Sequence, residues 1–312
     1  MPMVSCNPAG EMDLVAAVRL RRKLRLLHVD LIHAHTSHAL ALAVLATVGS
    51  SIPVVASRRV DVPFRGSTAS RWKYSRAAVV VAVSEAVRDV LVRGGLPPEQ
   101  VTVVYDGVDL ERETVPASPG ELAGLGVPEG APLAIQVAQM AWPKDPLTFV
   151  RATVQARRSV PALHGLLVGE GGERAAVERT IAELDAEAFV HLAGHRADAD
   201  ALLAAADVVV LSSRGEGMGS VLLDALMMGR PAVGTRAGGI PEVLVDGESG
   251  LLTPVGDAAA LGTAMVRVLL EPGLADRLAA EGRKRAQYFS MARTAQATLA
   301  VYRRVLLERQ LL

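Results

Sequence analysis

The sequence contains a single cysteine, Cys6, among 312 residues. A lone thiol has no partner within the chain, which excludes a disulfide scaffold and favours a reducing compartment. The sequence also lacks an excess of either charge, because 33 basic and 33 acidic residues leave a net charge of zero. Domains that bind nucleic acid usually carry a basic excess, so we expect no nucleic acid as a partner.

Long hydrophobic runs are also missing. The longest uncharged stretch, from His38 to Ser57, contains Gly49 and Pro53, which predicts a helix, a turn and a strand in place of a membrane span. The first ten residues have neither the basic start nor the apolar core of a signal peptide. We therefore expect a cytoplasmic protein.

The composition is that of a folded chain, with 50% hydrophobic and 21% charged residues. Short apolar runs alternate with helical patterns in the first hundred residues, which predicts a parallel sheet covered on both faces. The expected strands are Asp30–His33, Ile52–Ala56, Ala77–Val83 and Val101–Tyr105, and the expected helices are His38–Val48 and one capped by Ser84.

A segment rich in proline and glycine, Glu111–Gly130, is predicted to link two domains. A second alternating series follows it and predicts a complete doubly wound α/β domain. The domain boundaries are expected at 1–125 and 126–285, with a C-terminal helix at 286–312 that packs back on the first domain. The expected strands of the second series are Leu133–Val137, Leu163–Val168, Phe189–Leu192, Val208–Leu211, Pro231–Gly234 and Leu251–Thr253, and its longer helices are Asp145–Arg157, Glu173–Leu184, Asp198–Ala205 and Ser220–Met228.

Candidate functional residues concentrate between Ser212 and Gly250. A glycine-rich loop, Arg214–Gly219, leaves a predicted buried strand and enters a predicted helix, where backbone N–H groups attract phosphate. Glu216 lies on this loop, and Asp224 follows eight residues later inside the helix. Both carboxylates can face one cleft at the carboxyl ends of the strands, and each can accept several hydrogen bonds from sugar hydroxyls.

This segment resembles the donor-binding signature of the retaining GT-B glycosyltransferases of family 4. The shared pattern is a Glu-Gly-x-Gly loop, a second acid eight residues after the first, and the motifs Gly-Gly-x-x-Glu and Asp-Gly-x-x-Gly-Leu. The matching residues are Glu216, Gly217, Gly219, Gly229, Pro231, Gly238, Gly239, Glu242, Asp246, Gly247, Gly250 and Leu251. The resemblance implies an α/β fold of two Rossmann-like doubly wound domains.

The resemblance also implies roles for individual residues. Glu216 and Lys144 are expected to be catalytic, with Glu216 on the sugar hydroxyls and Lys144 on the donor diphosphate. Two residues depart from the family pattern: Asp224 stands where the family usually has glutamate, and Gln139 stands where it commonly has arginine. The expected donor-binding residues are Asp224, Gln139, Gly217, Gly219, Gly238, Gly239, Glu242, His195 and Arg196.

The predicted N-terminal domain offers candidates for the acceptor side, namely His35, His38, Arg58, Arg59 and Asp61. Two interpretations stay open for them. The histidines are either substrate contacts or ordinary groups at a strand end, and the arginines are either near the reacting sugar or solvated and paired with Asp61. No carboxylate or thiol accompanies the histidines, so we expect no metal site and no cofactor beyond the donor.

The family's first strand and its Gly-Gly loop have no counterpart here, and DLIHAH, from Asp30 to His35, resembles the fourth strand of that domain. We therefore expect an N-terminal domain that lacks its first βα units. A βαβ unit takes at least about 30 residues, and roughly two such units would be missing. Leu31–His35 would then keep an unpaired edge. The shortening is a hypothesis from the sequence.

A basic segment precedes this strand and carries Arg19, Arg21, Arg22, Lys23 and Arg25 beside an apolar stripe. It is either an ordinary surface helix or, at 19–25, a peripheral contact with anionic lipid at the inner face of the membrane. The sequence makes no prediction about the oligomeric state.

The function implied by the resemblance is transfer of a sugar from a nucleotide-diphosphate sugar to an acceptor, with retention of the anomeric configuration. The acceptor would be a cell-envelope glycan, a lipid or a small molecule. Two alternatives stay open: an inactive homologue that binds nucleotide sugars, and a GT-B nucleotide-sugar epimerase.

Overall fold

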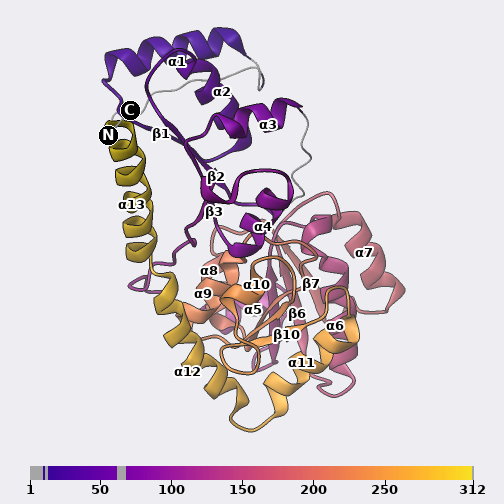
Figure 1. Ribbon diagram of the computed structural model, residues 1–312. Helices are drawn as coiled ribbons and strands as arrows, with labels where there is room; N and C mark the ends of the chain where they lie inside the picture. Colours follow the sequence, from indigo (N-terminus) through magenta and orange to yellow (C-terminus); the bar gives the residue numbers. More distant parts are fainter. Residues whose placement is uncertain (1–9, 11–12, 62–67, 311–312) are drawn as a thin grey trace. The chain divides into compact units, whose positions relative to one another are not determined.

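The computed structural model describes residue 10, residues 13–61 and residues 68–310. The chain forms two compact α/β units (Figure 1). The first unit comprises Met1–Tyr105 and Thr294–Leu312, and the second comprises Asp106–Arg293. Both units consist of parallel strands with helices between them, which is the predicted fold class.

The observed division falls earlier than the predicted boundary near residue 125. Val108 lies in the second unit because its backbone N–H donates to the Phe289 carbonyl at 2.7 Å and because it bridges to Ser290. The predicted linker also contains a helix, α5 (Pro119–Gly124), which Ser118 and Glu121 close with a capping box. Composition alone pointed to a linker since proline and glycine also mark helix ends.

The first unit holds a four-stranded sheet of order β1-β2-β3-β4, and within the described residues β1 pairs only with β2. The strands are β1 (Ile32–Ala34), β2 (Val54–Arg58), β3 (Val79–Ala82) and β4 (Val101–Val103). The helices are α1 (Leu14–Leu26), α2 (Ser37–Thr47), α3 (Thr68–Ser75), α4 (Glu85–Arg93) and the 3-10 turn η1 (Pro98–Gln100). Ser84 caps α4 through the Val87 N–H, as its position before a helical pattern predicts.

The C-terminal helix α13 (Met291–Gln310) runs alongside this sheet (Figure 1). Its Val301 and Val305 are buried in one cluster with Val55 and Val79 of the sheet. The chain therefore leaves the first unit after β4 and returns to it with its last helix.

The second unit holds a six-stranded sheet of order β10-β9-β8-β5-β6-β7, all parallel. The strands are β5 (Leu133–Val137), β6 (His164–Val168), β7 (Val190–Gly194), β8 (Val208–Leu211), β9 (Ala232–Thr235) and β10 (Leu251–Thr253). The chain builds from β5 outward to β7 and then returns to the other side of β5 with β8. The carboxyl ends of β5 and β8 thus form a topological switch point, where open α/β sheets bind ligands.

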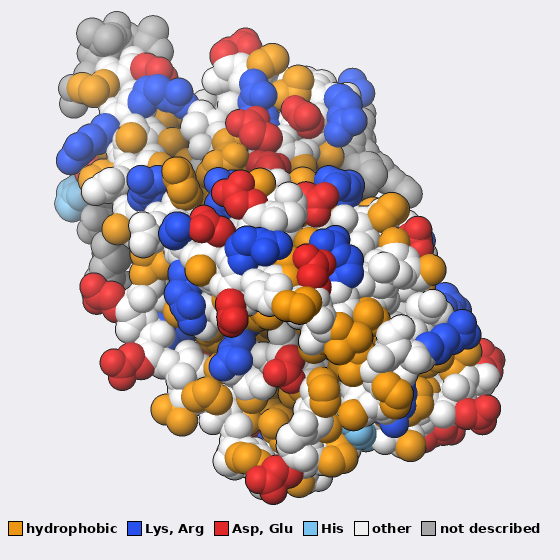
Figure 2. All heavy atoms as spheres, turned by 90° about the horizontal axis from the view of Figure 1, so that it is seen from below, with side chains coloured by type: hydrophobic (Ala, Val, Ile, Leu, Met, Phe, Trp, Pro, Cys, Tyr) orange, Lys and Arg blue, Asp and Glu red, His pale blue; other side chains and the backbone are white. Residues whose placement is uncertain are grey.

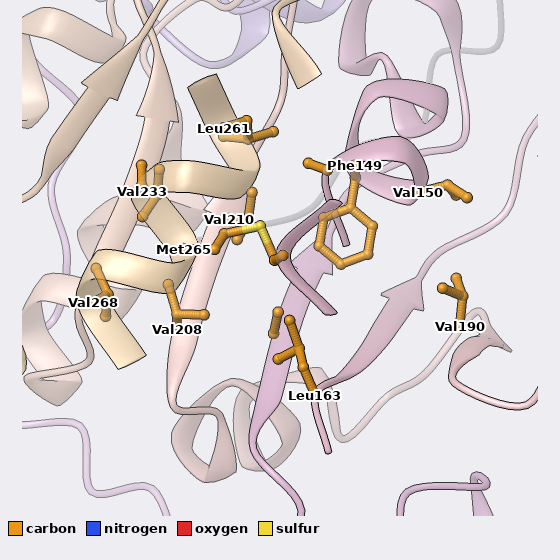
Figure 3. Packing of buried hydrophobic residues seen from close by; sticks show 14 of the residues in the cluster. Phe149, Val150, Leu163, Val190, Val208, Val210, Val233, Leu261, Met265 and Val268 are labelled. Atoms are coloured by element: carbon orange, nitrogen blue, oxygen red, sulfur yellow. The ribbon is translucent and has the colours of Figure 1, made fainter. Parts of the chain in front are cut away.

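Helices cover both faces of this sheet. They are α6 (Pro146–Arg157), α7 (Arg174–Glu183), α8 (Ala199–Ala205), α9 (Ser220–Met228), α10 (Ile240–Val243), α11 (Ala258–Leu270), α12 (Leu274–Ala286) and the 3-10 turns η2 (Trp142–Lys144) and η3 (Gln287–Phe289). Figure 3 shows the core, in which Phe149 of α6 and Met265 of α11 pack with Val208 and Val210 of β8. Every residue of β8 is buried, which explains its uninterrupted apolar sequence.

Among the described helices, none is by itself long and apolar enough to cross a membrane. One pair passes that test together by length and composition, Ala258–Leu270 with Leu274–Phe289, and it is bent by 100°. Most of the apolar residues of α11 face the core of the second unit.

Candidate functional site

Two loops meet at the switch point of the six-stranded sheet. One follows β5 and includes η2, and the other follows β8 and carries the glycine-rich sequence. The backbone N–H of Arg214 donates to the Pro143 carbonyl at 2.8 Å, and the N–H of Gly215 donates to the same oxygen at 3.2 Å. The two loops are therefore joined by backbone hydrogen bonds, which do not depend on the identity of the side chains.

These loops bring together Lys144 and Glu216, the two residues expected to be catalytic. Lys144 Nζ and Glu216 Oε2 form an ion pair, and Ser213 Oγ donates to the same carboxylate oxygen at 3.2 Å. The Glu216 side chain is 11% exposed and that of Lys144 is 29% exposed. The pair is shielded from bulk water, so its charges interact more strongly than those of a surface pair.

The second glycine-rich turn is attached to the same loop. The N–H of Gly239 donates to the Glu216 carbonyl at 3.0 Å, and Gly238 has φ +47°, a conformation that favours glycine. Glu242 is partly buried in α10, and its carbonyl accepts a hydrogen bond from Arg285 Nη2 at 2.6 Å. The turn at Gly238 and Gly239 is thus attached to the loop that carries Glu216.

Asp224 lies on α9 and contacts an arginine that the sequence did not single out. Arg112 Nη2 donates to Asp224 Oδ1 at 2.6 Å, and Arg112 Nη1 lies 3.2 Å from Asp200 Oδ2. Arg112 comes from the segment predicted to be a linker, 112 residues before its partner. No local spacing in the sequence could reveal this contact, because it depends on how the segment folds back on α8 and α9.

The environment of Asp224 makes its charge costly. Burial raises the pKa of the Asp224 carboxyl above its usual range, and the like charge of Asp200 acts in the same direction. The Arg112 guanidinium opposes both effects through its charge and its hydrogen bond. The Nε atom of Arg112 is buried and has no hydrogen-bond partner among the described residues.

Gln139 is exposed on the loop that follows β5. A close approach of the next loop fixes the backbone around it: the Met140 N–H donates to the Glu170 carbonyl at 2.9 Å. A Cβ atom at Gly171 would lie 2.2 Å from the Met140 carbonyl oxygen, so only glycine fits there. The glycine-rich turn after β6 therefore supports the position of Gln139.

The remaining donor-side candidates have separate surroundings. His195 is exposed after β7, whereas Arg196 forms a bidentate pair with Asp198 at 2.8 and 2.6 Å. This pairing raises the pKa of Arg196 and lowers that of Asp198. Gly217 is buried, and Gly219 has φ +84° at the start of α9, where no side chain caps the helix. The first N–H groups of α9 therefore have no capping side chain.

The acceptor-side candidates belong to the first unit. His35 and His38 are exposed, and the His35 ring lies 4.1 Å from that of His33. Arg58 ends β2, where its Nε donates to the Val60 carbonyl at 3.2 Å and its Nη1 donates to Tyr74 Oη at 3.3 Å. The other two candidates, Arg59 and Asp61, lie in the loop after β2, and Arg59 is exposed.

His33 is a half-buried polar residue of the first unit, on β1, and the sequence did not mark it as a site residue. Its Nδ1 lies 2.6 Å from Tyr302 Oη and its Nε2 lies 2.7 Å from Ser57 Oγ. Burial, with a smaller effect of His35, lowers the pKa of His33 to about 4. The sequence could not reveal this contact, because the partner Tyr302 lies 269 residues further along the chain.

Within the described residues, no three His, Cys, Asp or Glu side chains come together as a group that could hold a metal ion. On the face in Figure 2, Lys and Arg side chains are interspersed with Asp and Glu side chains. On this face no area of a single charge stands out.

Comparison with solved structures places the fold among the GT-B glycosyltransferases. The Anabaena HepE protein in complex with UDP-glucose aligns with a TM-score of 0.83 at 23% identity, over 96% of this chain and 85% of that one. Sucrose-phosphate synthase from Thermosynechococcus elongatus aligns with a TM-score of 0.81 at 22% identity, over 96% and 80% of the two chains. Both likenesses concern the fold.

Comparison of sequences identifies the family. The profile described as Glycosyl transferases group 1 matches residues 131–271, and the one described as Glycosyltransferase Family 4 matches residues 2–112. Alpha-maltose-1-phosphate synthase of Mycobacterium tuberculosis is 30% identical over 88% of this chain and 79% of its own length. The chain belongs to glycosyltransferase family 4.

D-inositol 3-phosphate glycosyltransferase of Saccharomonospora viridis is 32% identical over 86% of this chain. The match covers 64% of that relative's length, so this chain spans less than two thirds of it.

Proposed function

We propose that this protein transfers a glycosyl group from a nucleotide-diphosphate sugar to an acceptor, with retention of the anomeric configuration. The observation that carries the proposal is the shielded Lys144–Glu216 pair at the switch point of the second unit. A cation and a carboxylate side by side suit a ligand that offers phosphate oxygens to one and sugar hydroxyls to the other.

Binding of the donor would exchange the partners of this pair. Lys144 would turn from Glu216 to the diphosphate, and Glu216 would accept hydrogen bonds from the sugar. Asp224, held by Arg112, would bind the ribose hydroxyls. Gln139 and the turn at Gly238 and Gly239 would complete the diphosphate site.

The chemical step would depend on stabilising the diphosphate as it leaves the anomeric carbon. Negative charge grows on the leaving oxygen as the glycosyl bond breaks, and a preorganised cation lowers the energy of that state. Lys144 supplies the charge, and the uncapped N–H groups at the start of α9 add a favourable dipole. Because these groups belong to the chain, we propose that no divalent metal is required, and turnover that EDTA abolishes would contradict this.

The first experiment is a screen of UDP-, GDP- and ADP-sugars for thermal stabilisation of the protein. We expect one nucleotide class to stabilise it, and hydrolysis or transfer of that donor to follow. Proton NMR of the first product then reports the anomeric configuration. A product with the inverted configuration would overturn retention.

A second candidate function is an inactive homologue that binds nucleotide sugars. Gln139 and Asp224 favour it, because each provides less than the usual family residue: one lacks a charge and the other is one methylene shorter. Donor binding without turnover, at saturating donor and with several acceptors, would support this alternative.

We also propose a cytoplasmic location with peripheral contact to anionic membrane through the basic segment at 19–25. The helix α1 exposes apolar side chains beside these charges: Leu14 is 64% exposed, Val18 50% and Leu26 79%. Together they match an interfacial helix. Equal binding to neutral and anionic vesicles would remove this proposal.

A further inference from the structure

A glutamine lies in the middle of the core of the second unit. Gln136 is on the central strand β5 and is 1% exposed, and its neighbours along the strand on both sides are apolar. A buried amide lowers stability unless its donor and acceptor groups find partners. An apolar side chain of similar size would fit this strand without that requirement, so the amide calls for an explanation.

The partners of Gln136 are the two loops of the site. Its Oε1 accepts hydrogen bonds from the Ser212 N–H at 3.1 Å and from Ser212 Oγ at 2.8 Å. Its Nε2 donates to the Lys144 carbonyl at 3.3 Å. One side chain thus bridges the residue that carries the catalytic amine and the loop that leads to Glu216.

Ser212 reinforces the bridge. It is fully buried, and its Oγ also lies 3.1 Å from the Lys144 carbonyl and 2.8 Å from the Asp145 carbonyl. Asp145 in turn has φ +45°, caps α6 through Thr148 and pairs with Arg214 at 2.8 Å. The backbone of Lys144 is therefore held by buried side chains on the side of the sheet.

We propose that Gln136 is a positioning residue, which sets the place of the Lys144 amine relative to Glu216 and thereby the affinity for the donor diphosphate. The proposal rests on the proposed function. A displaced Lys144 carbonyl would shift the start of a long, flexible side chain, and a shift of about 1 Å in a site is enough to weaken it strongly.

The test compares Gln136→Met with a matched control, Thr153→Val. Thr153 is also a fully buried polar residue of the second unit, but its hydroxyl donates to the Phe149 carbonyl within α6, away from Lys144. We expect both variants to lower the melting temperature and only Gln136→Met to weaken donor binding, by about tenfold in calorimetry. The same loss in Thr153→Val would overturn the proposal.

Two further variants separate positioning from general damage. In a Lys144→Ala background, Gln136→Met should change donor affinity no further, because the group that it positions is gone. Gln136→Glu should bind the donor nearly as well as the native protein at pH 5.5 and about tenfold more weakly at pH 8. A neutral carboxylic acid can donate to the Lys144 carbonyl as the amide does, whereas a carboxylate cannot. A pH-independent affinity in Gln136→Glu would contradict the proposal.

A measurement that needs no donor tests the positioning of Lys144 separately from the proposed function. The chain has lysine at four positions only, so acylation of each amine can be followed by mass spectrometry. We expect Gln136→Met to speed the labelling of Lys144 several-fold relative to Lys284, which is 70% exposed, and Thr153→Val to leave the ratio unchanged. Faster labelling in a protein that binds no nucleotide sugar would refute the proposed function and still support positioning. An unchanged ratio would overturn positioning.

Discussion

The two units have the same plan of parallel strands and helices, yet polar side chains at their sheets have different roles. In the second unit, Gln136 and Ser212 bind the loops that carry Lys144 and Glu216. In the first unit, His33 binds Tyr302 of the C-terminal helix and Ser57 of the neighbouring strand. Polar side chains at the sheet therefore fix the loops of a charged pair in the second unit and bind the C-terminal helix in the first.

The largest effect should follow from removing either charge of the pair in the second unit. We expect Lys144→Ala and Glu216→Gln each to lower kcat/KM for transfer by at least about 10²-fold, because in the proposed function each removes a group that acts directly on the donor. The measurement is steady-state turnover with the donor that the screen identifies. Near-native turnover in either variant would refute the assignment of the site.

Exposed residues provide the control for this comparison. Lys284 lies on the surface, paired with Glu281 on the same helix, so Lys284→Ala should leave kcat/KM within about twofold. A loss as large as that of Lys144→Ala would mean that general charge, and not the switch-point pair, supports the reaction.

Much of the second unit could be predicted from the sequence because its strands are buried on both faces. The strands Leu133–Val137, Val208–Leu211 and Leu251–Thr253 and the helix Ser220–Met228 have the predicted bounds. Continuous apolar runs between glycine-rich turns leave little choice of structure. The strands of the first unit differ from their predicted bounds by up to two residues, and β2 (Val54–Arg58) runs into Ser57 and Arg58 beyond the apolar run that predicted it.

The parts of the site that could not be predicted depend on long-range contacts. Lys144 and Glu216 stood out through their motif. In contrast, Arg112, Gln136 and Ser212 contact partners that are 67 to 112 residues away, apart from the short link of Gln136 to Lys144. Buried polar residues in an apolar strand are the one signal that could have indicated Gln136, because such groups need partners.

In the first unit, acid should weaken the fold through His33. Its pKa of about 4 lies below that of a histidine in an unfolded chain, near 6.5, so the unfolded state binds the proton more tightly. Stability from this group is complete above about pH 6.5 and is lost as the pH falls towards 4, by roughly 1–2 kcal/mol because solvent screens part of the effect at this half-buried ring. We expect His33→Gln to flatten this part of the pH profile.

The measurement is urea unfolding between pH 7.5 and pH 4. The chain has two tryptophans, Trp72 in the first unit and Trp142 in the second, so a Trp142→Phe background lets fluorescence report on the first unit alone. An equal loss of stability in His33→Gln and in the background protein would show that His33 does not set the acid response.

Asp224 provides a smaller effect in the second unit, where the pKa of the group is raised and not lowered. Burial raises the pKa of its carboxyl and Arg112 opposes the rise, so Arg112→Met should raise that pKa further. As the pH is lowered, donor affinity of this variant should start to fall at a higher pH than in the native protein, because a protonated carboxyl accepts fewer hydrogen bonds from the ribose. Arg112→Lys, which keeps the charge, should respond less, and a pH-independent affinity in Arg112→Met would contradict this role.

The smallest effect separates the two possible roles of His35. Its charge contributes to the low pKa of His33, so His35→Ala should raise the pKa of His33 slightly and stabilise the first unit in acid by a few tenths of a kcal/mol. NMR titration of the His33 ring measures the shift directly. If His35 also binds the acceptor, the same variant raises KM for the acceptor and leaves the affinity for the donor unchanged. If His35 is only an exposed group beside His33, the pKa of His33 shifts, whereas KM for the acceptor and the affinity for the donor both stay unchanged. The first unit would then contribute to the reaction through other residues, such as Arg58 or Arg59.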